Sequence, residues 1–379
     1  MLQQIELMNF KCFEIVKLPL AELTLLSGSN ASGKSSLLQA LVLLHQTIQE
    51  NEWSARLILN GDILKLGTVQ DVVNKIHGRN EFELAITNEE HTYRWKFLGE
   101  RHEMSMNIDY IHDDNKSLIE ELPLNYLLPF SPGEIVPKIG LNLETLTYIT
   151  AERIGPRDFY SLEDRSKIQT VGPKGEHAVS RLFRFADKQI SEKLAINTAP
   201  QTLLRQVEAW MQRFFPGCGI EVTQIPRMNA VTLGIRTSDE TDYHRPINVG
   251  FGLTQVLPIL VAVLSAEADD LILIENPEVH LHPSGQALMG AFLALAASAG
   301  TQILIETHSD HVLNGIRRAI RQETLKPEQV ALHFFRPPTK GFDQVVSPQV
   351  DMSGNIDMWP EGFFDQFDKD MNHFAGWGE

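Results

Sequence analysis

The chain has 379 residues, of which 43% are hydrophobic and 22% are charged, and its net charge is -16 at pH 7. This composition describes a soluble globular protein with ample material for a core, and it excludes a low-complexity or disordered chain. The acidic balance disfavours a protein whose whole surface binds nucleic acid, because the release of phosphate counterions needs a basic face.

The cysteines and the apolar segments limit the cellular compartments in which the protein is expected. Cys12 and Cys218 lie far apart and without a Cys-x-x-Cys spacing, so the sequence predicts neither a disulfide framework nor a thiolate zinc site. The N-terminus has no basic stretch followed by an apolar run, and no segment approaches the roughly 18 apolar residues of a membrane span. We therefore expect a cytoplasmic protein without a membrane partner.

The N-terminal part reads as the start of an α/β unit. Leu2–Leu7 alternates between polar and apolar residues like a strand, and the apolar run Leu18–Ser27 is expected to form one buried strand that stops at a glycine. A helix is expected from Lys34 to about Gln49. From Phe82 to Asp109, short alternating segments with charged faces are typical of antiparallel strands, which we expect to form a side lobe.

Helical spacing of apolar residues between Gly172 and Phe215 indicates the helices of an insertion. Heptads are not sustained over many turns, which excludes a long coiled-coil arm. The last third alternates helices with strands again, and this order implies a mainly parallel sheet. Its expected elements are helix Leu253–Ala268, strand Leu271–Glu275, helix Ser284–Ala297, strand Gln302–Glu306, helix Asp310–Arg321 and strand Val330–Phe335.

These patterns predict one discontinuous domain that an insertion interrupts. The expected first part is 1–150 with the side lobe, the mostly helical insertion is 151–245, and the second part is 246–379. The strands of the last third need partners, and we expect the N-terminal strands to supply them.

A phosphate-binding loop follows the second predicted strand. A strand ends, a loop bounded by Gly28 and Gly33 turns, and a helix begins at Lys34, which is the context that a P-loop requires. Loop amides can surround the β-phosphate of ATP, Lys34 would neutralise the β- and γ-phosphates, and the Ser35 hydroxyl would coordinate Mg²⁺. The residues expected to bind ATP here are Gly28, Asn30, Ala31, Ser32, Gly33, Lys34, Ser35 and Ser36. A glycine loop without a ligand is the disfavoured alternative.

Two later strands end in polar residues. Glu275 closes a buried apolar strand and is the candidate second ligand of Mg²⁺, with a cap of the turn at Pro277 as the alternative. His308 follows the next strand, at the sheet edge where open α/β folds bind ligands, and it is a candidate contact of the γ-phosphate or the attacking water. The alternative for His308 is a neighbour of a helix N-cap, because Ser309 and Asp310 both suit that role.

Two other polar clusters are not expected to bind metal. His280 and His282 alternate along the chain, but no third ligand stands at a suitable spacing. Asp365, Asp368 and Asp370 are typical of an acidic solvated tail.

Four blocks together resemble the ABC-type ATPase heads of the SMC, RecF and OLD group, which includes AAA_21-like bacterial ATPases. Their order in the chain is the family's order. The blocks are Ile5–Phe13, Gly28–Ser35, Asn248–Gln255, and Leu271–Pro283 followed by Glu306–Asp310. The resemblance implies a P-loop NTPase of the ABC-ATPase head type, with a mixed sheet, an antiparallel β side lobe, a helical insertion, and ATP and Mg²⁺ as cofactors.

The resemblance also implies a signature segment that caps the γ-phosphate of ATP bound to the other subunit. Gly250, Gly252, Thr254 and Gln255 match that block; a flexible Gly-x-Gly hinge is the alternative. Lys11 falls where the family often has a basic residue near the nucleotide, and a solvated strand residue is the equal alternative. Gln70 matches the magnesium-sensing glutamine poorly, and no residue is assigned to that role.

One departure from the family concerns hydrolysis. Most ABC ATPases end this strand in aspartate followed by a catalytic glutamate, whereas here Glu275 is followed by Asn276, with Glu278 two residues on. An amide cannot act as a general base. We therefore expect slow hydrolysis, or hydrolysis that depends on Glu278, His308 or Glu275 itself. Some OLD-like members also carry Glu-Asn-Pro-Glu, so the change does not imply an inactive enzyme.

The leading hypothesis is an ATPase that closes as a head-to-tail homodimer, or a higher oligomer, on ATP and gates a DNA-related or defence effector. The segment 350–365 resembles a tail of bacterial AAA_21-like ATPases, many relatives of which belong to anti-phage modules. The chain after Phe335 is too short for the Toprim domain of OLD nucleases, so a nuclease or toxin is expected as a separate protein. The second hypothesis is a scaffold that binds ATP with little turnover and holds the effector inactive. A small-molecule kinase is the third, and the signature argues against it.

Overall fold

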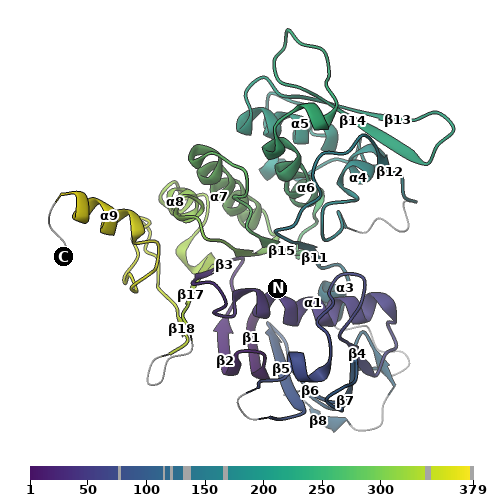
Figure 1. The fold of residues 1–379 in the computed structure, drawn as a ribbon, viewed down its shortest axis with the longest axis vertical. Helices are drawn as coiled ribbons and strands as arrows, with labels where there is room; N and C mark the ends of the chain where they lie inside the picture. The colour runs from purple at the N-terminus through teal and green to yellow at the C-terminus, as the bar shows by residue number, and fades with distance from the viewer. Residues whose placement is uncertain are drawn as a thin grey trace. The chain divides into compact units, whose positions relative to one another are not determined.

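The computed structural model describes residues 1–75, 78–113, 116–119, 123–130, 138–164, 170–337 and 343–375. The chain forms two compact units, which are coloured along the sequence in Figure 1. Unit 1 comprises 1–146, 330–351 and 355–379, and unit 2 comprises 147–329 with 352–354.

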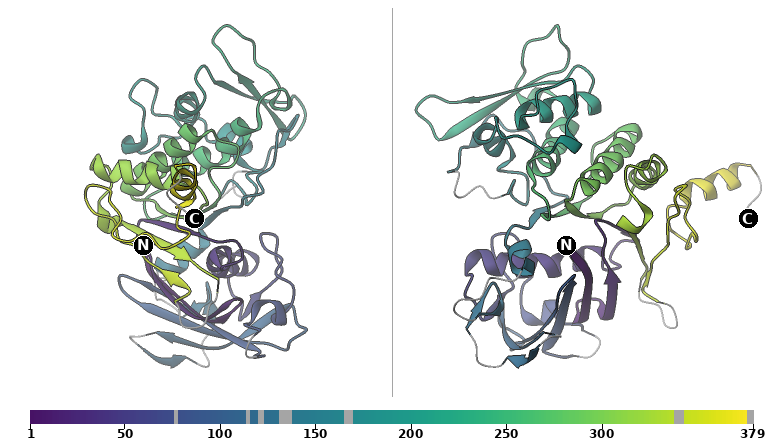
Figure 2. Two further views of the ribbon diagram at one scale, coloured as in Figure 1. Left: turned by 60° about the vertical axis from the view of Figure 1, so that its left-hand side comes forward. Right: turned by 180° about the vertical axis from the view of Figure 1, so that it is seen from behind.

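An antiparallel sheet forms the side lobe of unit 1, as the sequence predicted. Its strands follow the order β2-β1-β5-β6-β7-β4, and β8 pairs with β7. Alternate residues of β1 are buried, so one face of this strand packs into the core while the other carries polar side chains. Figure 2 shows the β1–β2 hairpin in purple. The strands are β1 (Leu2–Phe10), β2 (Phe13–Pro19), β4 (Arg56–Ile58), β5 (Glu81–Asn88), β6 (Thr92–Leu98), β7 (Ser105–Asp113) and β8 (Lys116–Ile119).

The expectation of one strand over Leu18–Ser27 is wrong. Strand β2 ends at Pro19, and a new strand, β3 (Leu23–Gly28), begins four residues later and belongs to a different sheet. Proline cannot donate to a strand ladder, which is why it stands at the end of β2. The apolar run is therefore continuous in sequence, but its two halves form strands of two different sheets.

Strand β3 positions the phosphate loop of unit 1. It is buried from Leu23 to Ser27 and pairs in parallel with β17 (Val330–Phe335), which pairs in turn with β18 (Val345–Val346). Helix α1 (Lys34–Glu50) follows the loop. The other elements of this unit are α2 (Val69–Val72), β9 (Leu124–Asn125), β10 (Leu128–Pro129), α3 (Lys138–Glu144) and α9 (Gln366–Phe374).

Unit 2 contains a parallel sheet in the order β11-β15-β16. Tyr148 of β11 (Thr147–Ile149) lies opposite Leu273 of β15 (Leu271–Glu275), and Glu275 lies opposite Glu306 of β16 (Gln302–Glu306). The three strands therefore end at the same edge. The helices expected beside them are present as α6 (Phe251–Ser265), α7 (Pro283–Ser298) and α8 (Asp310–Arg321).

Two glycines bring α7 and α8 into close contact (Figures 1 and 2). A Cβ on Gly290 would lie 2.1 Å from the carbonyl oxygen of Val312, and a Cβ on Gly315 would lie 2.1 Å from that of Ala287. A larger side chain at either position would push the helices apart.

The region expected to be a mostly helical insertion holds helices and strands. The helices expected between Gly172 and Phe215 are present, and a small sheet in the order β12-β14-β13 accompanies them. The sequence did not indicate these strands. The elements are β12 (Tyr160–Ser161), α4 (Ala178–Arg184), η1 (Glu192–Leu194), α5 (Leu203–Phe214), β13 (Gly219–Gln224), β14 (Ala230–Arg236), η2 (Pro246–Asn248) and, before β17, η3 (Pro327–Gln329).

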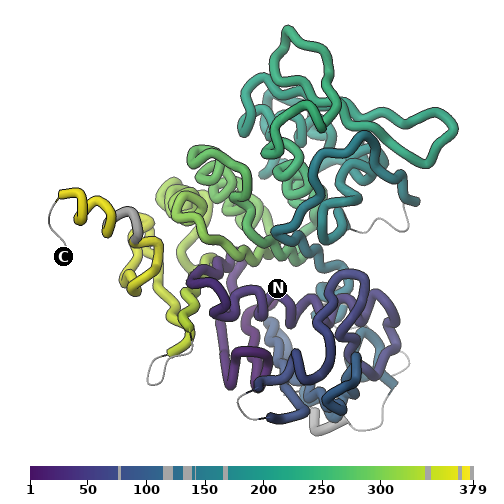
Figure 3. The backbone as a smooth tube through the Cα atoms, in the orientation of Figure 1, coloured from purple at the N-terminus to yellow at the C-terminus, as the bar shows by residue number. Residues whose placement is uncertain are grey.

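The C-terminal segment, drawn in yellow in Figure 3, leads from β18 to α9. It is anchored on β17, because the fully buried ring of Phe363 lies 5.4 Å from that of Phe334. None of the helices described is long and apolar enough to cross a bilayer.

Candidate functional site

The phosphate loop of unit 1 is closed around the lysine at its end. Lys34 is 3% exposed, and its Nζ donates to the carbonyl oxygens of Gly28 (3.1 Å) and Ser29 (2.8 Å). The Ser32 hydroxyl also donates to Ser29 O, at 2.7 Å. These bonds tie the two ends of the loop together and hold the ammonium group inside it.

Both glycines of the loop are required by the packing around them. Gly28 has φ 133°, and a Cβ there would lie 2.1 Å from the carbonyl oxygen of Phe335. Gly33 has φ 112°, and a Cβ there would lie 2.5 Å from the Phe13 ring and 2.7 Å from Cys12 Sγ. Other residues rarely adopt these φ values, so the two positions accept glycine alone. The sequence motif thus has a steric cause within this unit.

The open side of the loop fits a phosphate group. Ser29, Asn30 and Ala31 are exposed, and the half-buried Ser35 and Ser36 stand in the first turn of α1. Helix α1, every residue of which is described, carries no acidic residue in that turn. Backbone amides at a helix start and the positive end of a helix dipole attract anions. The Ser35 hydroxyl is the group that would hold Mg²⁺ here.

Lys11 lies in the β1–β2 turn and not on a strand. Its φ is 48°, and its Nζ donates to Oε1 of Gln39 on α1. Burial lowers the pKa of its ammonium group. The turn therefore brings Lys11 to the helix that follows the phosphate loop.

In unit 2, the carboxylate of Glu275 is held by two donors that the sequence did not point to. The Tyr148 hydroxyl donates to Oε1 at 2.5 Å, and the Ala151 amide donates to Oε2 at 3.2 Å. Burial, followed by the charge of Glu275, raises the pKa of Tyr148, so the phenol remains a donor. Groups that orient a metal-binding carboxylate are typically placed in this way. Glu275 therefore fits the role of Mg²⁺ ligand.

Arg153 is a further residue of this site that the sequence did not indicate. It is 6% exposed, and its guanidinium donates to the carbonyl oxygens of Thr150 (3.2 Å), Glu275 (2.9 Å) and Asn276 (2.8 Å). Burial lowers its pKa to about 10, so it stays charged at neutral pH. In the sequence, Arg153 is marked only by its place after a short apolar segment. Many surface arginines have the same placement, so this feature does not single out a functional residue.

Asn276 occupies a turn that explains its residue type. Its φ is 43°, in the left-handed region that asparagine tolerates better than most residues. Its amide donates to Glu306 O at 2.7 Å, and its carbonyl accepts from Arg153. Two residues later, Oε1 of Glu278 accepts from the His308 amide at 2.9 Å. Glu278 and His308 therefore meet at the edge where β15 and β16 end.

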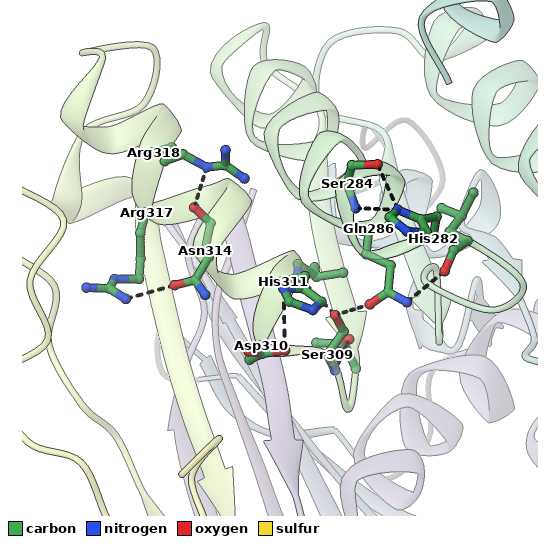
Figure 4. A network of polar contacts seen from close by, with 12 residues as sticks. His282, Ser284, Gln286, Ser309, Asp310, His311, Asn314, Arg317 and Arg318 are labelled. Atoms are coloured by element: carbon green, nitrogen blue, oxygen red, sulfur yellow. Dashed lines mark hydrogen bonds and ion pairs between the residues drawn. The ribbon is translucent and has the colours of Figure 1, made fainter. Parts of the chain in front are cut away.

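Figure 4 shows the polar network around Ser309 and Gln286. The Ser309 hydroxyl caps α8 by accepting from the Val312 amide at 3.2 Å, and it donates to Oε1 of Gln286 at 2.6 Å. The His282 ring caps α7 by accepting from Ser284 N at 3.4 Å. This arrangement fixes the start of α8 and leaves the His308 side chain exposed. Within the described ranges, no group of three or more His, Cys, Asp or Glu residues is arranged to hold a metal ion.

The signature segment begins α6 in unit 2. Gly250 is its exposed N-cap, with open space where a Cβ would stand, whereas a Cβ on Gly252 would lie 2.8 Å from His280 O. Thr254 and Gln255 are each 4% exposed. The Thr254 hydroxyl donates to Phe251 O at 2.9 Å, and the Gln255 amide donates to the backbone of residues 153 and 154. These two side chains make hydrogen bonds inside unit 2 and do not face a ligand. The groups of this segment that can contact a ligand are therefore the backbone amides at Gly250 and Gly252.

Comparison with protein families gives two matches. Residues 1–199 and 87–313 match a family model described as AAA ATPase domain, and residues 325–373 match one described as a protein of unknown function, DUF3696. The chain is also 23% identical to the OLD nuclease of Thermus scotoductus, over 94% of this chain and 68% of that protein.

Solved structures of Smc heads share the fold. An Smc head bound to the C-winged helix domain of ScpA aligns with a TM-score of 0.53 and 14% identity, over 92% of this chain and 97% of that one. An Smc head with an extended coiled coil, bound to the C-terminal domain of ScpA from Pyrococcus furiosus, aligns with a TM-score of 0.52 and 12% identity, over 99% and 98%. The predicted resemblance and the mixed α/β fold of an SMC/RecF/OLD-like ATPase are confirmed.

Proposed function

Because the chain belongs to the AAA ATPase domain family, we propose that it binds Mg-ATP and closes as a head-to-tail dimer on two ATP molecules. Each ATP lies between the phosphate loop of one copy and the Gly250–Gln255 segment of the other. Closure changes the surface offered to a separate effector, which is a nuclease or toxin, or to DNA. The proposal extends to this chain the nuclease connection of the Thermus scotoductus relative.

The observation that carries the proposal is the exposed N-terminus of α6. Gly250 leaves the first amides of the helix open, and these amides together with the helix dipole attract a phosphate. Two apolar side chains flank this point, since Ile247 is 52% and Phe251 is 53% exposed. Exposed apolar residues around an anion-binding backbone support contact with a second copy that carries a nucleotide.

Gly250 allows a sharper test than Gly252. Substitution of Gly252 would strike the His280 carbonyl, whereas Gly250 has room for a side chain and a φ of -63° that any residue adopts. Aspartate is a favourable N-cap, so Gly250→Asp should leave the nucleotide-free protein at least as stable as the wild type. Its carboxylate would repel the γ-phosphate of the partner's ATP.

Solution mass from light scattering, with and without Mg-ATPγS, tests the dimer. We expect the wild type to double its mass with nucleotide, and Gly250→Asn, an uncharged cap of nearly the same shape, to do the same. Lys34→Ala and Gly250→Asp should keep the mass of the nucleotide-free form. Nucleotide-driven doubling of Gly250→Asp would exclude this segment from the seam.

A second candidate function is a scaffold with little turnover, and the conformation of Asn276 favours it. The left-handed turn selects asparagine, and the residue that most ABC ATPases use as a base is absent at this point. Such a protein would hold ATP for long periods and keep the effector inactive.

Steady-state hydrolysis by wild type and by Asn276→Asp separates the two functions. Aspartate tolerates the left-handed region better than glutamate and supplies a carboxylate. A scaffold should hydrolyse ATP slowly and gain activity with this substitution. Brisk hydrolysis by the wild type, unchanged in Asn276→Asp and lost in Glu278→Gln, would support the switching ATPase instead.

A further inference from the structure

A side chain that immediately precedes β18 reaches the phosphate loop of the same unit. Gln344 Nε2 donates to the carbonyl oxygen of Ser32 at 3.0 Å and lies 3.6 Å from Cys12 Sγ. The residue is half-buried, and its own backbone is fixed because its carbonyl accepts from Arg336 N at 2.8 Å. The amide of Gln344 is therefore presented to the loop from backbone that is hydrogen-bonded beside the antiparallel pair β17–β18.

The Ser32 carbonyl accepts from Gln344 Nε2 at 3.0 Å and, at the longer distance of 3.9 Å, from Cys12 Sγ. The shorter of these bonds helps to set how one peptide group of the loop is oriented. Every peptide bond described is trans, and in a planar trans peptide the C=O and the following N–H point in opposite directions. When Gln344 holds the Ser32 carbonyl on its side, the Gly33 N–H points away from Gln344. Gly33, with φ 112°, imposes little steric resistance to rotation of this peptide. The Gln344 amide, which lies outside the loop, therefore restrains the rotation of the Ser32–Gly33 peptide that glycine would otherwise allow.

We propose that Gln344 is a positioning residue of the nucleotide site, which keeps the Gly33 amide directed at the β-phosphate. A flipped Ser32–Gly33 peptide would present a carbonyl oxygen to the phosphate, and two partial negative charges would repel each other. The inference depends on the proposed binding of ATP to this loop.

Strand β17 supports the other end of the loop. The carbonyl of Phe335 accepts from Ser29 N at 3.3 Å and lies where Gly28 leaves no room for a Cβ. Phe335 and Gln344 both fall within residues 325–373, the part matched to a family of unknown function. A role for that part of the chain is thus to complete the phosphate loop at both of its glycines.

Gln344→Met tests the proposal, because methionine keeps the length of the side chain and removes the donor. We expect the Kd for Mg-ATP, measured by calorimetry, to rise about three- to tenfold, as for loss of one neutral hydrogen bond. In steady state, KM for ATP should rise while kcat is unchanged. The melting temperature of the nucleotide-free protein should fall by only a few degrees, as for the loss of one hydrogen bond. Gln344→Glu, which places oxygen against oxygen, should weaken binding at least as much.

The matched control is Gln349→Met, at an exposed glutamine that follows β18 and whose amide donates to Ser347 O at 3.3 Å. It should bind ATP like the wild type. Wild-type affinity in Gln344→Met and Gln344→Glu would overturn the inference, and so would equal losses in Gln344→Met and Gln349→Met. Lys34→Ala separates this failure from failure of the proposed function, because a wild type that binds ATP no better than Lys34→Ala would refute nucleotide binding itself.

Discussion

The Tyr148 hydroxyl donates a 2.5 Å hydrogen bond to the Glu275 carboxylate across 127 positions of sequence. The two residues stand on neighbouring parallel strands, β11 and β15. A buried phenol that remains protonated can orient a carboxylate without neutralising it. Strand β11 therefore supplies a donor that orients the carboxylate at the end of β15.

Tyr148→Phe removes this donor and leaves the ring in place. We expect kcat for ATP to fall about tenfold or more and the requirement for Mg²⁺ to increase, in the range seen when groups that orient metal ligands are removed. ATP binding without Mg²⁺ should be unchanged. The matched control is Tyr110→Phe, which removes a 3.1 Å bond to Glu83 in the side lobe and should leave activity intact. Equal activity and Mg²⁺ dependence in Tyr148→Phe and wild type would refute the orienting role.

Arg153→Lys should destabilise the protein even though it keeps the positive charge. A lysine cannot reproduce the fork that reaches the carbonyls of Glu275 and Asn276 together. Each buried carbonyl left without a donor costs about 1–3 kcal/mol. The free energy of unfolding in urea measures the loss. Arg245→Lys, at an exposed arginine 3.6 Å from Asp158, is the control, and a similar small effect of both substitutions would show that the fork is unimportant.

The conformation of Asn276 predicts an order of stabilities. Asn276→Gly should be nearly neutral, because glycine adopts φ 43° freely. Asn276→Ala and Asn276→Glu should each lose about 1 kcal/mol or more, as expected for ordinary residues in the left-handed region. Thermal unfolding of the four proteins checks this order. If alanine were as stable as glycine here, the turn would not be the reason for the asparagine.

Elements that a clear pattern of apolar residues marks along the chain were predictable from sequence. Strand β15 and strand β16 have the predicted bounds Leu271–Glu275 and Gln302–Glu306, since a short apolar run next to a helical pattern has one interpretation in an α/β chain. The phosphate loop was predictable for a different reason. Gly28 and Gly33 are required by contacts with Phe335 and Phe13, so the motif carries its own steric cause.

Contacts over long sequence separation were not predictable. Tyr148, Arg153 and Gln344 look like ordinary polar or aromatic residues in one sequence, and their roles depend on which distant backbone they meet. The break of β2 at Pro19 was missed because the apolar run continues through it. Thr254 and Gln255 matched a family block, yet both side chains serve the interior of unit 2. A local pattern therefore predicts a helix or strand, but it does not predict which distant residue each side chain contacts.

Two buried histidines predict a loss of stability in mild acid. Burial lowers the pKa of His45 and of His333 to about 4, below the ordinary value of 6.5. The unfolded chain therefore binds more protons than the folded one between these values, and stability falls as the pH drops from about 6.5 to about 4. At pH 5 the loss is on the order of 2 kcal/mol for each histidine, relative to pH 7.5.

His333→Gln should reduce this pH dependence. Its Nε2 lies 2.8 Å from Pro19 O and its Nδ1 lies 2.8 Å from the Ser347 hydroxyl, so the neutral ring is held between a carbonyl and a hydroxyl. Glutamine has no proton to gain in this range, and the difference in unfolding free energy between pH 7.5 and pH 5 should shrink by about 2 kcal/mol. His373→Gln, at an exposed histidine, should leave the difference unchanged. The same pH dependence in all three proteins would mean that His333 becomes protonated without cost, which contradicts its burial.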